Sequence, residues 1–103
     1  MTPPELIAMF KGESAFFASL PDVREAVLYG SALQEQELND DVDLMIVPSR
    51  EMPEGEKIDL RQAVWAHFKD RLPVMLEVVT PTAELNPDAL AAAGVPRESV
   101  YQR

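Results

Sequence analysis

The stretch LYGSALQEQELNDDVDLMIV, residues 28–47, governs the predicted topology of this chain. It joins two apolar runs that are typical of buried strands. Gly30-Ser31 ends the first run, and Asp41-Val42-Asp43 begins the second. Two carboxylates that face the same way repel each other unless a cation lies between them. The stretch therefore predicts a strand, a turn and a second strand that starts with an acidic site.

The composition predicts one folded domain over residues 1–103. A chain of this length has room for one hydrophobic core, and 47% hydrophobic residues argue against disorder. The net charge of −9 disfavours a nucleic-acid binder, since phosphate neutralisation needs a basic surface. The same charge suits a cation or a partner with a basic face. Without cysteine, neither a disulfide nor a thiolate metal site can form.

No membrane association is expected from the sequence. No apolar run approaches the roughly 20 residues of a membrane-spanning helix. The N-terminal residues lack the basic and then apolar layout of a signal peptide. We therefore expect a soluble cytoplasmic protein.

Helices and strands are predicted in alternation along the chain. Thr2 and Glu5 have capping-box spacing, which places the start of the first helix. In chain order, the predicted elements are a helix over 2–20, a strand over 23–29, a short helix over 32–38, a strand over 42–47, a helix over 56–71, a strand over 74–80, a helix from Asn86 towards Gly94, and a final strand or arm over 99–103. The link of about ten residues between the first two strands is short for a crossover, which favours an antiparallel pair. These elements predict an α/β (α+β) fold, a small mixed sheet of three or more strands with helices packed on it.

The acidic residues predict a metal site. Because side chains alternate along a strand, Asp41 and Asp43 project from one face, roughly 6–7 Å apart along the backbone. Glu77 is an isolated acid inside the apolar run VMLEVVT, and it reaches the same point if the third strand lies beside the second. Carboxylate oxygens are the ligands that Mg²⁺ prefers. Three such side chains would hold two divalent ions, as in phosphoryl-transfer and nucleotidyl-transfer enzymes.

Gly30 and Ser31 predict a phosphate site beside these acids. A glycine at a strand end lets the backbone approach a ligand closely. A helix that starts after it offers free N–H groups to a phosphate, and the Ser31 hydroxyl adds a hydrogen bond.

These residues resemble a known family. Gly-Ser, nine residues, Asp-x-Asp and a later carboxylate form the pattern of the minimal nucleotidyltransferases, small members of the DNA polymerase β-like superfamily. The similarity extends over nearly the whole chain, including its length and the order of its elements. The Gly-Ser and Asp-x-Asp part is moderately specific.

The resemblance implies a nucleotidyltransferase fold and a defined chemistry. It implies ATP or another nucleoside triphosphate as substrate, two Mg²⁺ ions, metal ligation by Asp41 and Asp43, and a role for Glu77 in activating the attacking hydroxyl. The product would carry a nucleoside monophosphate, and pyrophosphate would leave. Many members of the family neutralise a HEPN-domain toxin, which gives the expected partner, and some do so by adenylylating it.

The sequence departs from the family pattern in three places. Leu33-Gln34-Glu35 stands where Ala-Arg-Gly is common, Asp40 replaces the usual Ser, and Glu77 replaces an Asp. Two alternatives therefore stay open. Besides an active nucleotidyltransferase, the chain could be a weakened module of the same fold that neutralises a partner by binding, or an unrelated small α/β domain whose acids are merely solvated.

Two further side chains carry expectations. Trp65 lies on the apolar stripe of the third predicted helix with Phe68, which predicts that both are buried in the core, with an interface over part of the stripe as the alternative. His67 lies off that stripe and is expected in solvent.

Overall fold

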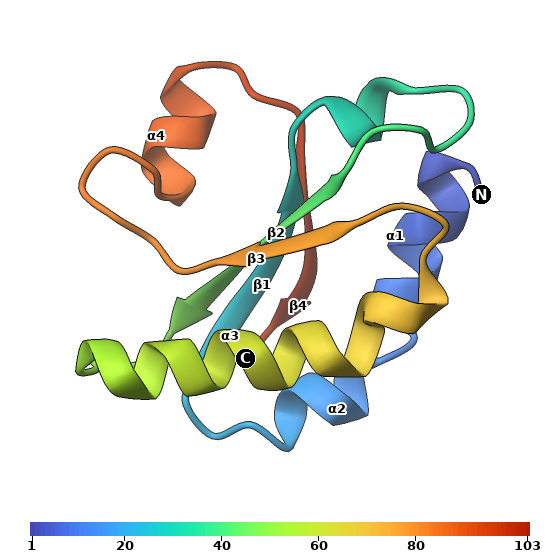
Figure 1. The fold of residues 1–103 in the computed structure, drawn as a ribbon. Coiled ribbons are helices and arrows are strands. Elements are labelled where there is room, and N and C mark those ends of the chain that lie inside the picture. Colours follow the sequence, from blue (N-terminus) through green and yellow to red (C-terminus); the bar gives the residue numbers. More distant parts are fainter.

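The chain forms a four-stranded mixed sheet with helices on both faces (Figure 1). The computed structural model describes residues 1–103. Its helices are α1 Pro3–Lys11, α2 Ser14–Ala18, α3 Glu54–Phe68 and α4 Pro87–Ala92, with short 3₁₀ helices η1 Ser31–Gln34 and η2 Lys69–Arg71. Its strands are β1 Val23–Tyr29, β2 Val42–Pro48, β3 Leu76–Val79 and β4 Arg97–Gln102. The predicted small α+β architecture is thus confirmed.

The strand order is β3-β2-β1-β4. β1 pairs antiparallel with both β2 and β4, and β2 pairs parallel with β3. The antiparallel pairing of the first two strands was predicted from their short link and is confirmed. The final residues, for which a strand or an arm was predicted, form β4.

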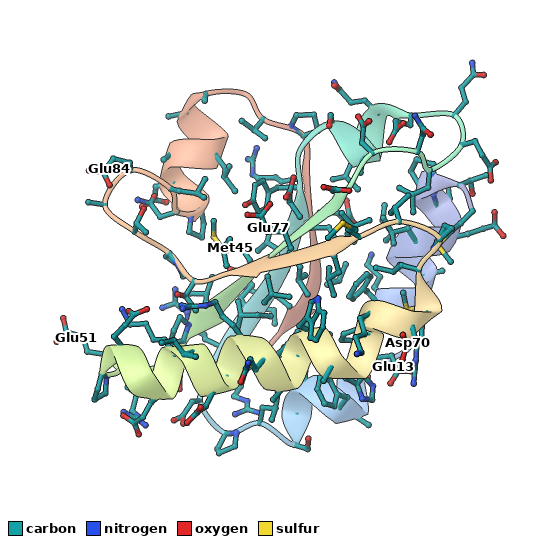
Figure 2. The ribbon with its side chains drawn as sticks, viewed as in Figure 1. Glu13, Met45, Glu51, Asp70, Glu77 and Glu84 are labelled. Atoms are coloured by element: carbon teal, nitrogen blue, oxygen red, sulfur yellow. The ribbon has the colours of Figure 1, made fainter.

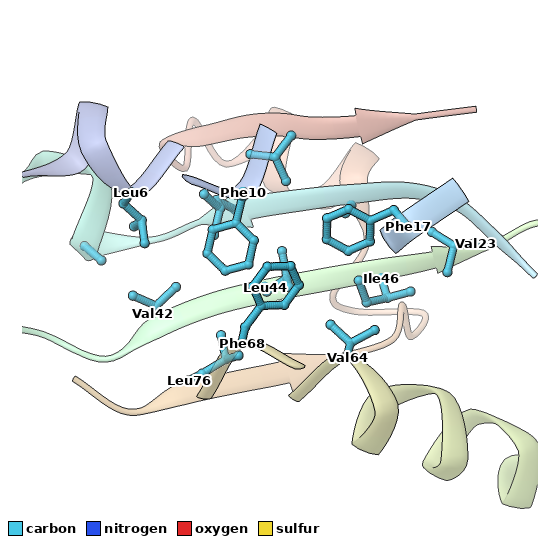
Figure 3. Close-up of a cluster of buried hydrophobic side chains, with 14 of the residues drawn as sticks. Leu6, Phe10, Phe17, Val23, Val42, Leu44, Ile46, Val64, Phe68 and Leu76 are labelled. Carbon is cyan, nitrogen blue, oxygen red and sulfur yellow. The ribbon is translucent and has the colours of Figure 1, made fainter. Parts of the chain in front are cut away.

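Helices α1, α2 and α3 cover one face of the sheet and enclose the main core. α1 starts at the predicted capping box. The Thr2 side chain accepts a hydrogen bond from the Glu5 backbone N–H, and the Glu5 side chain accepts one from the Thr2 backbone N–H. Figure 3 shows the side chains that meet over the sheet. Those with no exposed surface are Leu6, Phe10, Phe17, Val23, Ala26, Leu44, Ile46, Val64 and Phe68. Alternate positions of β2 supply the centre of this core, as the strand periodicity requires.

Helix α4 covers part of the opposite face (Figure 1). Its N-cap is Asn86, whose side chain accepts from the Ala89 N–H at 2.9 Å, and Gly94 follows its end with φ 68°. Leu90 from this helix packs on Val27, Met45 and Val47 of the sheet. None of the chain's helices combines the length and the apolar character that crossing a membrane requires.

Two predicted helices are wrong in extent. The helix predicted over 2–20 breaks after Lys11 into α1 and α2, with Gly12 as the C-cap of α1. The helix predicted over 32–38 is absent beyond Gln34, because tertiary contacts hold the chain extended. The Leu38 side chain is buried in the core, and its N–H donates to the Met1 carbonyl at 2.7 Å.

The expectations for α3 are partly wrong. Phe68 is buried as predicted, but Trp65 is an exposed side chain. His67 is half-buried, because its ring stacks on Phe16 with the centroids 3.7 Å apart, and Nε2 lies 3.2 Å from Glu13 Oε2. The break between α1 and α2 brings Phe16 and Glu13 to α3, which the sequence pattern does not reveal.

Candidate carboxylate site

The strand register brings two of the predicted acids together. Asp43 of β2 is the direct partner of Glu77 of β3, so both side chains project from the same face. Asp41 precedes β2 by one residue and keeps the same alternation. Figure 2 shows Glu77 on the side of β3 away from α3. Asp43 and Glu77 therefore lie side by side at one end of the sheet, with Asp41 in the same pocket, and their role as metal ligands stays a prediction.

A polar pocket of about 430 Å³ lies over these acids. Its lining contains no hydrophobic residue and consists of Ser31, Asn39, Asp40, Asp41, Asp43 and Glu77. Helix α4 covers the apolar part of this face, so the pocket opens at the uncovered end of β2. Five oxygen-bearing polar side chains and one amide can therefore meet a ligand here.

Asp43 is the electrostatic centre of the pocket. Burial, the charge of Glu77, a hydrogen bond with Glu77 and the charge of Asp41 together raise the pKa of Asp43 to about 6. Each of these causes disfavours the ionised carboxylate, and the two neighbouring charges would be offset by a cation. The pocket thus has the electrostatics of a cation site.

Position 30 requires a glycine because the Asp43 carboxylate lies close to its backbone. Its φ is 95°, in the region that glycine adopts without strain, and a Cβ at this position would lie 3.1 Å from Asp43 Oδ2. The Gly30 N–H donates to the Pro96 carbonyl at 2.9 Å. The predicted close approach at this glycine therefore exists, but the group that approaches is the Asp43 carboxylate.

Ser31 lines the pocket, but its hydroxyl already bonds to a neighbouring acid, whereas the sequence predicts that it binds a phosphate. Its hydroxyl donates to Asp40 Oδ2 at 3.2 Å. The following element is the four-residue η1, which is too short to offer the dipole and free N–H groups of an α-helix. A phosphate would have to compete with Asp40 for the Ser31 hydroxyl.

Glu35, which stands where the family that the chain resembles has a glycine, has a structural role in this chain. The Glu35 carboxylate accepts the backbone N–H groups of Asn39 and Asp40, at 3.4 and 3.0 Å. These bonds fold the loop that leads into β2. Glu35 therefore shapes the rim of the pocket and brings no positive charge to it.

The acids have the oxygen ligands that Mg²⁺ prefers, but their side chains are not arranged as a complete coordination site. Their oxygens are hard ligands, and burial, followed by the nearby charges of Glu77 and Asp41, raises the pKa of Asp43. No group of three or more His, Asp or Glu side chains has an arrangement that could hold a metal ion. Asp41 and Glu77 are exposed, so their side chains can rotate towards Asp43 at little cost. A metal site at this point would form by adjustment of side chains.

Two residues that lie in line with Asp43 across the sheet were not predicted from the sequence. Tyr29 of β1 pairs with Asp43, and Arg97 of β4 pairs with Tyr29. The row Glu77, Asp43, Tyr29 and Arg97 thus crosses all four strands on one face. Burial, followed by the charges of Asp43 and Glu77, raises the pKa of Tyr29 to about 12. With strands about 4.8 Å apart, the Arg97 backbone lies about 10 Å from that of Asp43.

Arg97 is a cation without a carboxylate partner. Its guanidinium donates to the Val95 carbonyl at 3.4 Å and forms no ion pair, and its side chain is exposed. The sequence could have revealed it only if the antiparallel pairing of β4 with β1 had been known. It is the one cation in this cross-strand row.

A second pocket, of about 440 Å³, lies at the other end of β2. It contains Arg50 and Lys57, but both are already paired. Arg50 binds Asp22 and Glu56, and Lys57 lies 3.9 Å from Glu54. The carboxylate pocket is slightly smaller but holds unpaired charge, and it is therefore the better candidate for a site of chemistry.

Comparison of the chain with protein-family models, with curated proteins and with solved structures finds no match. The family resemblance therefore stays a prediction that rests on the residues themselves.

Proposed function

We propose that this chain is a Mg²⁺-dependent nucleotidyltransferase that transfers AMP from ATP to a hydroxyl group of a protein partner. The proposed partner is a HEPN-type toxin, which the chain would neutralise as an antitoxin. The observation that carries this proposal is the pairing of Asp43 with Glu77, with Asp41 and Ser31 in the same pocket. The acids of the Gly-Ser and Asp-x-Asp pattern therefore share one pocket, and no hydrophobic residue lines that pocket.

The residues of the pocket have separate roles in this proposal. Asp41, Asp43 and Glu77 would hold Mg²⁺, which when bound neutralises phosphate charge. Gly30 keeps Asp43 in place, and Arg97 orients the far phosphates. The acceptor oxygen bonds to the α-phosphorus as the bond to the bridging oxygen breaks. Pyrophosphate leaves with that electron pair, and Glu77 accepts the hydroxyl proton.

The second candidate is a binding module of the same ancestry with little or no transferase activity. Two observations favour it. Asp40 holds the Ser31 hydroxyl, and the acids lack a finished metal arrangement. In this case the chain would neutralise its partner by docking, and nucleotide would bind weakly.

Metal binding is tested first, by thermal unfolding in EDTA and in MgCl₂ or MnCl₂. A ligand that binds the native state raises the melting temperature. The wild type should gain stability from either ion, and Asp43→Asn should abolish the gain. Asp70→Asn is the matched control, because Asp70 is exposed and lies far from Glu77 in the structure (Figure 2). Equal responses in all three proteins would place the metal elsewhere and refute the site.

Transfer is tested next, with ATP labelled at the α-phosphate and the candidate toxin as acceptor. Label on the toxin that depends on Asp43 supports the enzyme. A stable complex without label supports the binding module. Calorimetry with Mg-ATP separates the two further, since tight binding by the unmodified chain favours the enzyme.

A further inference from the structure

The outer edge of β3 is an unpaired strand edge. β3 pairs with β2 alone, and the Met75 carbonyl accepts from the Val42 N–H at 2.9 Å. Backbone groups alternate in direction along a strand, so the N–H and C=O groups of Leu76 and Val78 point away from the sheet. The strand itself contains neither Pro nor Lys, the residues that commonly protect such an edge.

The α3 side of this edge is an apolar groove. A pocket of about 210 Å³ there is lined by Ile58, Trp65 and Val78, with Arg61 and Gln62. The exposed large hydrophobic side chains of the whole molecule are Ile58 at 45%, Trp65 at 42% and Met75 at 75%. Two of them line the groove, and Met75 directly precedes β3. Two of the three exposed large hydrophobic side chains thus lie in this groove, beside the strand edge.

The opposite side of the same edge is acidic. Glu77 projects there (Figure 2) and is exposed. Asp43 is its direct partner on β2. Neither carboxylate forms an ion pair with a basic side chain, although basic side chains pair with acids elsewhere in the molecule. A strand added to β3 would therefore meet apolar side chains on one face and carboxylates on the other.

The acidic face of this edge indicates which kind of strand can pair with β3. A second copy of the chain would bring another net charge of −9 and place its own Glu77 beside this acidic face. Like charges opposite each other on paired strands are destabilising. A basic segment would instead gain favourable charge pairs in the same position.

We propose that the β3 edge is a docking site for an extended segment of a partner protein in which apolar and basic side chains alternate. Its backbone would pair with Leu76 and Val78 as a fifth strand. Its apolar side chains would fill the groove beside Trp65, and its basic side chains would face Glu77. This docking requires neither metal nor nucleotide, so it is independent of the proposed transferase activity.

Trp65 provides the signal for a direct test, because it is the single tryptophan of the chain. The probe is an eight-residue peptide of alternating valine and lysine with blocked ends, titrated in EDTA without nucleotide. Binding should shift the Trp65 emission to shorter wavelength as the groove is covered. One control peptide has the same order with N-methyl groups on alternate backbone nitrogens, and another alternates valine and glutamate. Both should bind about ten-fold or more weakly, since one loses strand hydrogen bonds and the other reverses the charge.

The matched protein variants are Glu77→Gln and Glu84→Gln, which remove the same charge at different places. Glu84 is exposed and lies away from β3 (Figure 2). Glu77→Gln should weaken the valine–lysine peptide about two- to five-fold, and Glu84→Gln should leave its affinity unchanged.

Three results would overturn this docking proposal. The first is equal affinity for the N-methylated peptide, which would indicate charge attraction alone. The second is an equal effect of both variants. The third is a dimer that forms with increasing protein concentration in sedimentation, and whose dissociation shifts the Trp65 emission to longer wavelength. Such a dimer would mean that a second copy of the chain occupies the β3 edge. Loss of metal binding in Glu77→Gln would bear on the transferase and leave the peptide comparison intact.

Discussion

The two faces of β2 differ in how completely they are covered. Val42, Leu44 and Ile46 face α1, α2 and α3 and join a core of 16 buried residues. Asp43, Met45 and Val47 face the other way, where α4 covers the last two in a cluster of four. One face is closed along its length, and the other is closed over half of it.

The two faces of β2 therefore have different roles, one in the stability of the fold and the other in the candidate site. Buried apolar area stabilises the fold, and the larger cluster provides most of it. The uncovered half of the opposite face keeps its carboxylates in contact with water and ligands. Asp43 is partly buried among other acids there, and the main core offsets the cost of ionising it.

The largest expected effect is the loss of core packing. Leu44→Ala removes a side chain with no exposed surface, and should lower the free energy of unfolding by about 2–5 kcal/mol. Leu90→Ala, in the smaller cluster, should cost about half as much, because the short helix α4 can move to fill the space. Urea denaturation of both variants measures the difference. Equal losses would contradict the contrast between the two faces.

A second effect concerns the contact that places the acidic site. Gly30→Ala introduces a residue at φ 95° and a Cβ that would lie 3.1 Å from Asp43 Oδ2. Strain of this kind costs about 1–3 kcal/mol. Chemical denaturation gives the loss, and Gly55→Ala is the control because an added Cβ there meets nothing within 4 Å. If both variants are equally stable, Gly30 is dispensable to the site.

A smaller effect is expected at the cationic end of the polar row. Arg97→Gln should weaken Mg-ATP binding about ten-fold, the loss of a charge contact near the low end of 1.5–3 kcal/mol. Calorimetry measures it. Arg24→Gln, which also removes an exposed arginine without an ion pair, should leave the affinity unchanged. If Arg97→Gln has no effect, the row does not reach the nucleotide.

The smallest effect is the pH dependence of the metal-free protein. The folded state raises the pKa of Asp43 from 3.8 to about 6, so the folded state binds its proton more tightly. The resulting stability is complete below about pH 4 and is lost as the pH rises through 6. Because Asp43 is partly exposed, the loss should be on the order of 1 kcal/mol.

Asp43→Asn removes this titration and isolates it from the other carboxylates. In EDTA the variant should gain stability relative to the wild type between pH 4 and pH 7. A constant difference over that range would mean that Asp43 is not perturbed.

Several elements could be predicted because their signals are local. β1 was predicted residue for residue from its apolar run, and the capping box at Thr2 and the Asn86 cap mark helix starts by short-range hydrogen bonds. The candidate acids were also predictable, since strand periodicity places Asp41 and Asp43 on one face. The helix predicted over 32–38 was wrong because the burial of Leu38 outweighs helix propensity, which is worth only tenths of a kcal/mol per residue.

The amino-acid sequence alone established an α+β domain with an acidic strand end, because periodicity and caps depend on neighbours within a few residues. Only the folded chain set Glu77 beside Asp43, added Tyr29 and Arg97 to that row, and left Trp65 exposed along an open edge. These relations depend on which strands become neighbours and in what register. Strand pairing joins residues far apart in the chain, and its free energy depends on the packing of the entire sheet.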